Sequence, residues 1–390
     1  MKHTPLYQEH IRRGARLTEF AGWALPLYYT GVLMEHRAVR TSIGAFDTSH
    51  MTSIVISGQG AERLVSRAFT NDIRGSERWQ AKYTHMLDAE GRIIDDMIVT
   101  KMDGEEYLCV ANASTAERVV SWLRGLAEDA CVEEITTQCG AVAIQGPNAP
   151  AVVERLLGTE AAGMCSFRAG MVHTQGMEWA EEDDARAPHQ PEVRGFLSRI
   201  RSGEAFVSCT GYTGEVGFEV LLSSASTGAL WRALLDAHGV TPAGLGARDT
   251  LRQEMGYLLS GQDFHEDRTP LEAGYAWVVK WNHDFVGREA LLAQRETGGY
   301  ERFMGVVLDT TRVPRSGCRI SRAGREIGKV TSGTLSPTLQ RGIALGYVKG
   351  EEAVEGTVVE LEIRGNIYKG LLQKPPLIRK GRERRRAMEG

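Results

Sequence analysis

Two adjacent carboxylates inside an apolar run constrain this chain more than any other feature of its sequence. Residues 91–99 read Gly-Arg-Ile-Ile-Asp-Asp-Met-Ile-Val, a pattern that predicts a half-buried strand carrying Asp95 and Asp96. Ionised carboxylates are rarely buried unless they are paired or take part in chemistry. Because successive side chains of a strand point to opposite faces, only one of the two is expected to face a given cavity. The plainer alternative is a strand end at which the second aspartate accepts backbone hydrogen bonds.

The flanking residues predict a small antiparallel meander around this strand. Its strands are expected at residues 83–87, 92–102 and 107–111, with turns at 88–91 and 103–104. A helix should follow, because Ser-Thr-Ala-Glu at 114–117 matches a capping box. In this arrangement Tyr83 and Asn112 flank Asp96.

The remainder of the chain predicts an α+β fold. Helices and strands alternate without a regular βαβ rhythm, which argues against a doubly wound parallel sheet. Beyond residue 300 the pattern changes to short strands and turns, and a separate β-rich domain is expected there. Its strands include residues 304–308, 327–330, 343–348 and 358–363. A chain of 390 residues is too long for one average core, so two or three domains are expected.

Composition narrows the classes of partner. A formal net charge of −4 argues against a broad nucleic-acid surface, which needs clustered excess lysine and arginine. The six cysteines and ten histidines show no CxxC, HxxxH or HExxH spacing, so no metal site is expected. No run approaches the roughly 20 apolar residues of a membrane span. The chain also opens without a targeting presequence, which predicts a cytoplasmic protein with no membrane attachment.

Residues 177–203 differ in character from their surroundings. Residues 181–184 are all acidic, Pro188 and Pro191 follow, and no apolar period is present. An exposed insertion loop is therefore predicted.

Two glycine clusters, at residues 210–219 and 244–249, are candidates for ligand contact. Neither contains the Lys-Ser or Lys-Thr of a phosphate-binding loop, and tight turns with glycine at positive φ are the structural explanation. The first cluster ends in Glu219 and the second carries Arg248. A carboxylate can accept two parallel N–H bonds, and a guanidinium can clamp a carboxylate or ring oxygen, which suits a flat polar heterocycle with an acidic tail. A salt bridge between the two loops is the alternative.

Ordered motifs over nearly the whole chain resemble the glycine cleavage T-protein, or aminomethyltransferase, family. Examples are Thr-Pro-Leu-Tyr at residues 4–7 and Gly-Ala-Phe-Asp-Thr-Ser-His-Met at residues 44–51. Further matching segments are residues 20–23, 70–72, 91–97, 145–147, 210–219, 244–250, 261–263, 284–291 and 331–339.

The resemblance implies three domains around a central folate-binding channel. The expected division is residues 1–50 with 140–250, residues 51–139 with 251–295, and residues 300–381 as a small β-barrel-like domain. The 177–203 insertion loop is longer than the connection expected there. It is either a passive surface loop or an element that reshapes the channel mouth or the carrier-docking face.

The resemblance also implies an activity. Tetrahydrofolate is the expected cosubstrate, and no metal is involved. A one-carbon unit passes from an aminomethylated lipoyl arm, carried by a separate H-protein, to tetrahydrofolate, with release of ammonia and formation of 5,10-methylenetetrahydrofolate.

The family's site residues carry over by position. The second aspartate of the Ile-Asp-Asp motif is the catalytic one in the family, and here it is Asp96. Tyr257 is expected on the helix after Arg248, and Arg379 follows Lys-Pro-Pro at 374–376 as the family's C-terminal arginine follows its Lys-Pro. The folate contacts implied in this way are Met51, Tyr83, Asn112, Tyr212, Glu219, Arg248, Tyr257 and Arg379.

Two alternatives share the fold. A tetrahydrofolate-dependent demethylase would take a methyl group from a small sulfur, oxygen or nitrogen compound and would need no carrier; the intact Ile-Asp-Asp-Met at residues 94–97 favours the aminomethyl reaction. A non-enzymatic folate-binding factor for iron–sulfur assembly would carry a Lys-Gly-Cys motif, which is absent from this sequence.

Overall fold

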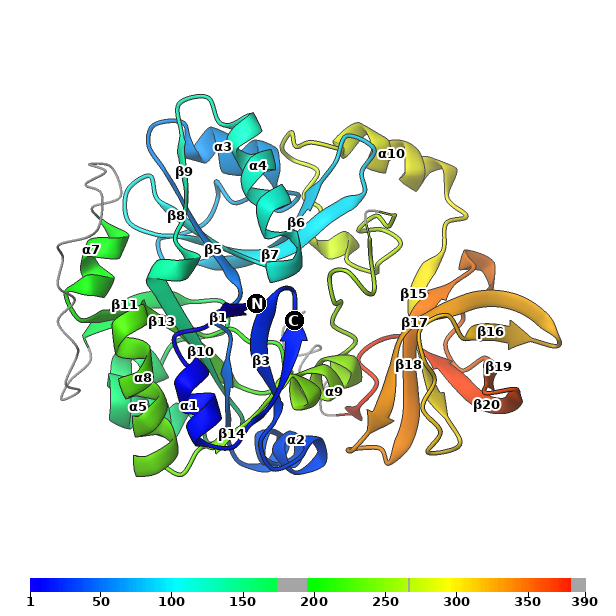
Figure 1. Cartoon of the computed structure of the whole chain (residues 1–390). Helices are drawn as coiled ribbons and strands as arrows, with labels where there is room; N and C mark the ends of the chain where they lie inside the picture. Colours follow the sequence, from blue (N-terminus) through cyan, green and yellow to red (C-terminus); the bar gives the residue numbers. More distant parts are fainter. Residues whose placement is uncertain (174–194, 266, 380–390) are drawn as a thin grey trace.

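Four β-sheets, one of them closed into a barrel, organise the chain (Figure 1). The computed structural model describes residues 1–173, 195–265 and 267–379. Helices cover the open sheets, and no regular βαβ succession is present among the described strands. The predicted α+β class, with a β-barrel at the C-terminal end, is confirmed.

The carboxylate motif lies on the second strand of a five-stranded sheet. The sheet has the order β6-β7-β8-β5-β9, made of β6 (Ala81–Leu87), β7 (Ile93–Lys101), β8 (Tyr107–Ala111), β5 (Thr52–Ser57) and β9 (Cys131–Glu134). The predicted meander is confirmed as β6-β7-β8. Its apolar face packs against α3 (Ala61–Ala68) and α4 (Ala116–Leu126), whose buried residues include Leu64 and Leu123.

The helix after the meander starts differently from the prediction. A 3-10 turn (Ala113–Thr115) precedes α4, and no side chain caps either segment. The capping box therefore does not form. The side chain of Asn112, which could have capped the turn, is instead bonded to Asp95 and Asp96.

A six-stranded sheet forms the second large layer. Its order is β11-β12-β13-β10-β4-β14, with β11 (Ala169–His173), β12 (Glu204–Ser208), β13 (Gly217–Ser223), β10 (Cys139–Gln145), β4 (Gly44–Asp47) and β14 (Thr241–Pro242). Helices α5 (Ala149–Leu157) and α8 (Ser224–Arg232) bury Val153 and Trp231 against it. A three-stranded sheet of β1 (Lys2–His3), β3 (Trp23–Tyr28) and β2 (Arg16–Phe20) lies at the N-terminus.

Part of the predicted insertion loop is helical. Residues 177–194 lie outside the described residues, but α7 (Phe196–Arg201) follows them directly. Phe196 and Ile200 are buried, and the Phe196 ring meets Phe206 edge-on with ring centroids 5.9 Å apart. The loop prediction is therefore wrong for residues 196–201, because tertiary packing stabilises a six-residue helix that is too short to form on propensity alone.

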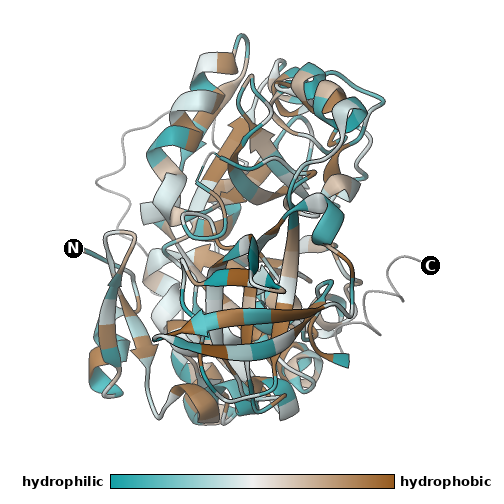
Figure 2. Cartoon of the chain, turned by 90° about the vertical axis from the view of Figure 1, so that its right-hand side faces the viewer, coloured by the Kyte–Doolittle hydropathy of each residue, from teal (hydrophilic) through white to brown (hydrophobic). Residues whose placement is uncertain are grey.

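The C-terminal strands close into a barrel. Its order is β15-β18-β17-β16-β19-β20, made of β15 (Arg302–Leu308), β18 (Arg341–Val348), β17 (Arg325–Ser336), β16 (Arg319–Arg322), β19 (Val358–Ile363) and β20 (Asn366–Gln373). Apolar and polar segments alternate along these strands (Figure 2), and the inward set includes Val306, Ile327 and Leu361. The four predicted strands are present, although β17 is much longer than the expected 327–330.

A central helix, α9 (Leu245–Met255), joins the barrel to the rest of the molecule. Glu254 at its end accepts hydrogen bonds from Arg40 (2.8 Å) on α2 (Val32–Thr41), and from Ser336 (2.6 Å) and Thr338 (2.9 Å) of the barrel. The Glu254 side chain is fully buried. This network connects three parts of the chain that are far apart in sequence.

The remaining helical segments are short. They are α1 (Tyr7–Arg12), α6 (Thr159–Ala162), α10 (Arg288–Thr297), the 3-10 turns Thr136–Gln138, Ala276–Val278 and Gly350–Glu352, and a π-helical turn (Ala233–Ala237). Within the described ranges, no helix combines the length and apolar character needed to cross a bilayer.

Candidate active site

Strand pairing brings Asp96 and Tyr83 to one face of the five-stranded sheet. His85 pairs directly with Asp96 across β6 and β7, and Tyr83 lies two residues from His85 on the same face. The Tyr83 hydroxyl donates to Asp96 Oδ2 at 2.7 Å. His85 Nε2 lies 3.3 Å from the same hydroxyl. Because the one hydroxyl proton of Tyr83 goes to Asp96, His85 must be the Nε2–H tautomer that donates to Tyr83.

Asn112 connects both carboxylates. It follows the last residue of β8, and its Nδ2 donates to Asp95 Oδ1 at 2.9 Å and to Asp96 Oδ1 at 2.8 Å. Its backbone N–H donates to Asp95 Oδ2 at 3.0 Å. The two side chains leave opposite faces of β7, and Asp95 is fully buried while Asp96 is half-buried, but both reach Asn112 where β8 ends. The alternative that the second aspartate takes the backbone bonds is revised, since Asp95 accepts the N–H of Asn112.

Burial raises the pKa of both carboxyl groups. The pKa of Asp95 rises to about 7 because the group is fully buried and because Asp96 is beside it. Burial also raises the pKa of Asp96, against the opposing hydrogen bonds from Tyr83 and Asn112. Two like charges this close do not ionise independently, so the pair retains a proton near neutral pH.

An aromatic wall borders Asp96. Ring centroids of Tyr83 and Tyr275 are 5.4 Å apart, and Trp277 lies near parallel to Tyr83 at 5.9 Å. Burial, and then the charge of Asp96, raise the pKa of Tyr83 and Tyr275, while burial lowers the pKa of His85 to about 3. His85 is therefore neutral at physiological pH. Trp277 is half exposed at the edge of the wall.

A second cluster surrounds Arg248. The rings of Tyr212 and Tyr257 stack with centroids 5.7 Å apart, and the Arg248 guanidinium carbon lies 4.7 Å from the centroid of Tyr212. This cation–π geometry holds the guanidinium over a flat aromatic surface. Burial lowers the pKa of Arg248, against the charges of Glu219 and Tyr212.

Glu219 on β13 lies within electrostatic reach of Arg248. Thr210 donates to Glu219 Oε2 at 2.5 Å, and Thr210 is bonded in turn to Ser208. The other carboxylate oxygen, Oε1, has no hydrogen-bond partner in the part of the chain that the structure describes. An acceptor on a half-buried carboxylate thus remains available beside Arg248.

The two clusters form one site. Burial raises the pKa of Tyr212, Arg252 and Arg248 oppose this effect, and the negative charge of Asp96 adds to it, so Tyr212 is within electrostatic reach of both clusters. Tyr275 responds in the same way to Asp96, Tyr257 and Tyr212. The Tyr212 hydroxyl donates to the Leu258 carbonyl, which fixes the ring.

Seven of the nine predicted site residues belong to these two clusters, and the remaining two are Met51 and Arg379. Met51 is half-buried and directly follows His50, whose pKa is lowered to about 4 by burial and by Arg248. Arg379 is exposed on the C-terminal segment, next to Leu377 and Ile378.

Two predictions about local structure are corrected. Tyr257 is not on the helix: α9 ends at Met255, and Gly256 adopts φ +71° before Tyr257. In the glycine clusters only Gly214 has positive φ. Gly211 and Gly217 lie so close to the Gln145 side chain that a Cβ at either would come within 2.4 Å of it. Close packing, more than turn geometry, therefore requires glycine in the first cluster.

Sequence reasoning missed His85, Tyr275 and Trp277. His85 had a usable signal, because it is two residues from Tyr83 on the same predicted strand. Tyr275 and Trp277 lie in an irregular segment around a short 3-10 turn, and no local pattern points to their position.

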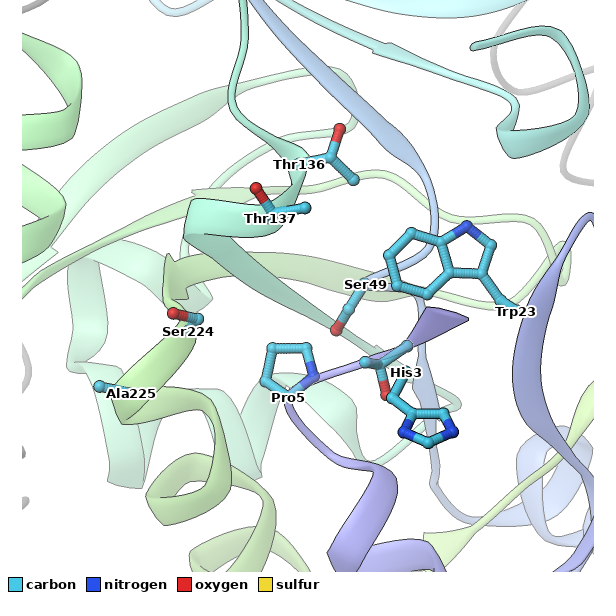
Figure 3. A pocket seen from close by; sticks show the side chains of 9 residues that line it. His3, Pro5, Trp23, Ser49, Thr136, Thr137, Ser224 and Ala225 are labelled. Carbon is cyan, nitrogen blue, oxygen red and sulfur yellow. The ribbon is translucent and has the colours of Figure 1, made fainter. Parts of the chain in front are cut away.

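Two further features of the described residues concern metal ligands and a separate cavity. No group of three or more histidine, cysteine, aspartate or glutamate side chains among them could hold a metal ion. A separate cavity of about 380 Å³ lies near the N-terminal strand (Figure 3) and contains no carboxylate or guanidinium. It is lined by His3, Thr4, Pro5, Trp23, Ser49, Thr136, Thr137, Ser224 and Ala225.

Comparison with known families covers nearly all of the chain. The GCVT N-terminal domain model matches residues 6–180 and 183–283, and the glycine cleavage T-protein C-terminal barrel domain model matches residues 301–378. An aminomethyltransferase of Halothermothrix orenii is 37% identical over 97% of this chain and 100% of its own. A probable aminomethyltransferase of Halobacterium salinarum is 39% identical over 97% and 99%. The crystal structure of glycine cleavage system aminomethyltransferase T from Bartonella henselae superposes with a TM-score of 0.84 at 31% identity, covering 97% of this chain and 98% of that one.

Proposed function

The chain belongs to the glycine cleavage T-protein family, and on this premise we propose that it moves a one-carbon unit from an aminomethylated lipoyl arm of H-protein to tetrahydrofolate. Its relatives and its structural neighbour make it an aminomethyltransferase. The products of the proposed reaction are ammonia and 5,10-methylenetetrahydrofolate. The nine predicted site residues and the three-domain division are part of this proposal.

The second cluster suits a folate. A flat heterocycle can stack on the paired rings of Tyr212 and Tyr257, which lie at an interplanar angle of 28°. The open oxygen of Glu219 can accept N–H bonds from a ring edge, and Arg248 can pair with a ring oxygen or a carboxylate. The donor set therefore fits a pterin ring carrying an acidic tail.

The first cluster suits the transfer step. When bound, tetrahydrofolate supplies the nitrogen nucleophile that takes up the one-carbon unit. Asp96 holds a negative charge or a proton at Oδ1 and Oδ2, next to the place where the aminomethyl nitrogen must leave. Tyr83 and Asn112 fix the direction of that carboxyl group, and positioned acid–base groups contribute about 10²–10⁴-fold to rate.

The aromatic wall supports a cationic donor. An aminomethyl group is positively charged at neutral pH, and the faces of Tyr83, Tyr275 and Trp277 attract cations. With His85 neutral, no positive side chain of the wall opposes the donor. The observation that carries the proposal is Asp96 itself: a carboxylate oriented by two donors, bordered by aromatic rings, and linked through Tyr212 to Arg248.

Reconstitution tests the proposal directly. The purified chain is mixed with tetrahydrofolate and aminomethylated H-protein, and methylenetetrahydrofolate and ammonia are followed together. Equal amounts of both products, dependent on both partners, are expected. A chain that ignores aminomethylated H-protein but demethylates a small methylated sulfur, oxygen or nitrogen compound would establish the demethylase alternative instead.

Glu219 and Arg248 are predicted to act on folate recognition. Glu219→Ala removes a charge-assisted acceptor worth about 1.5–3 kcal/mol, so tetrahydrofolate affinity should fall roughly 10- to 100-fold. Arg248→Ala should weaken binding comparably, because a half-buried cation over Tyr212 is lost. Calorimetric titration measures both.

A carboxylate on the neighbouring strand provides the control. Glu204 on β12 pairs with Arg199 and lies outside both clusters, so Glu204→Ala should leave folate affinity unchanged. Unchanged affinity in both the Glu219 and the Arg248 variants would contradict the folate placement.

A further inference from the structure

We propose that Asp95 is a positioning residue: it holds Asn112 at two points and thereby fixes the amide that orients Asp96. The inference rests on the proposed function for its role in turnover. The hydrogen bonds between Asp95 and Asn112, and the proton shared by Asp95 and Asp96, do not depend on that function.

The neighbours of the Asn112 side chain fix the orientation of its amide. Its Nδ2 lies 2.9 Å from Asp95 Oδ1, 2.8 Å from Asp96 Oδ1 and 3.1 Å from the Asp96 carbonyl oxygen. All three neighbours are acceptors, so an amide oxygen in that place would be repelled by each of them. The Asn112 carbonyl is therefore directed away from the pair, and it can accept a hydrogen bond from an N–H group of a ligand.

Asp95 accepts two hydrogen bonds from Asn112. One oxygen of Asp95 accepts from the side chain of Asn112 and the other from its backbone N–H at 3.0 Å. Two bonds to one residue fix the side-chain torsion relative to the backbone. Asp95 is fully buried, so it acts through these protein contacts and not through solvent.

The groups around Asp95 and Asp96 determine the charge of this pair. Neither Asp95 nor Asp96 forms an ion pair with a lysine or arginine among the described residues. The polar groups that act on the pair from neighbouring elements include the side chains of Tyr83, with His85 behind it, and of Thr115, Tyr212, Asp263 and Tyr275. Asp263 is itself paired with the buried guanidinium of Arg252 at 2.6 Å. Two adjacent carboxyl groups, one fully buried and one half-buried, without a cation in direct contact keep one proton between them, because a second negative charge there is costly.

A proton on Asp95 leaves Asp96 as the charged member. Both carboxyl groups accept two hydrogen bonds, but Asp95 is fully buried whereas Asp96 is half-buried, so a negative charge costs less on Asp96. The burial of Asp95 beside Asp96 places its titration near neutral pH, with a pKa of about 7. Asp95 therefore sets the pH at which a second charge arises beside the catalytic carboxylate.

Carboxyl ¹³C NMR of the ligand-free protein, with labelled aspartate, tests the shared proton without any turnover. The parent protein should show an aspartate titration near pH 7. In Asp95→Asn the remaining group, freed from like-charge repulsion, should titrate at least one pH unit lower. Asp88→Asn is the matched control: Asp88 is a buried carboxylate of the same hairpin that bonds Arg92, and its loss should leave the titration near pH 7 intact.

Kinetics test the positioning role. Asp95→Asn should lower kcat about 10- to 100-fold, and the inflection of the kcat–pH profile near pH 7 should move in the same direction as the NMR titration. Because Asp95 acts through Asn112, the double variant Asp95→Asn/Asn112→Ala should lose no more than the worse single variant.

Results that contradict the role of Asp95 can be told apart from results that contradict the proposed function. A parent without an aspartate titration near pH 7, or multiplicative losses with an unshifted profile in Asp95→Asn, would overturn the role of Asp95. If Asp95→Asn does not fold, the parent titration and the kcat–pH profile of Asn112→Ala decide the matter, since that variant releases the same grip. A parent that titrates as expected but does not use aminomethylated H-protein would refute the proposed function alone.

Discussion

Asp96→Asn is expected to lower turnover by about 10²-fold or more, the usual scale for loss of a positioned acid–base group. Asparagine keeps the size of the side chain, and its oxygen can still accept from Tyr83. Its amide nitrogen would then face Nδ2 of Asn112, and neither nitrogen can take a proton at neutral pH. The loss should therefore appear in kcat, while the fold and folate binding remain.

Single-turnover assays with tetrahydrofolate, together with calorimetric folate titration and a thermal melt, separate these effects. His85→Gln is a useful companion, because it keeps a donor towards Tyr83 and should cost far less than Asp96→Asn. Retention of most of the turnover in Asp96→Asn would remove this residue from the mechanism. An Asp96→Asn protein with an unchanged melt but no folate binding would move it to the binding cluster.

Glu254→Gln is expected to destabilise the protein by about 3–5 kcal/mol, the scale for breaking a buried ion pair. The carboxylate accepts from Arg40, Ser336 and Thr338, and the side chains of Glu254 and Arg40 are 0% and 8% exposed. Among the described residues, glutamine would leave the buried guanidinium of Arg40 with Glu215, at 3.2 Å, as its one charged partner. Denaturant unfolding measures the change in the free energy of unfolding.

The same network predicts that the protein loses stability at acidic pH. Burial opposes ionisation of Glu254, but hydrogen bonding and charge from His36, Arg40 and Ser336 outweigh it and lower its pKa from 4.5 to about 2. A pKa that is lower in the folded state stabilises the fold above the unfolded value. Stability should therefore be lost as the pH falls from about 4.5 towards 2, and that part of the loss should be missing in Glu254→Gln.

An exposed ion pair provides the contrast. Arg63 and Asp129 lie 2.9 Å apart with side chains 64% and 73% exposed, so Asp129→Asn should change stability little. Equal destabilisation by Asp129→Asn and Glu254→Gln would mean that burial of the network contributes nothing special.

Local sequence pattern was sufficient for the elements that carry the site. Alternation of apolar and polar residues predicts β6, β7 and β8 within two residues of their ends. It also predicts four of the six barrel strands, although β17 is much longer than expected. This succeeds because a two-residue period is a property of the strand itself and of one buried face. The same reasoning failed for α7, a six-residue helix with three buried apolar side chains, which is stabilised by packing that includes Phe206.

Some features of the candidate site could likewise be predicted from local sequence pattern, and others could not. The sequence by itself determined that two carboxylates interrupt a buried strand, that Tyr83 lies on the strand before it, and that Asn112 follows the strand after it. Only the tertiary structure decided that Asp95 and Asp96 both meet Asn112, and that Tyr275 and Trp277 complete the wall. The physical reason is that strand period fixes the face from which a side chain leaves, whereas its partners depend on where neighbouring strands and irregular segments end in space.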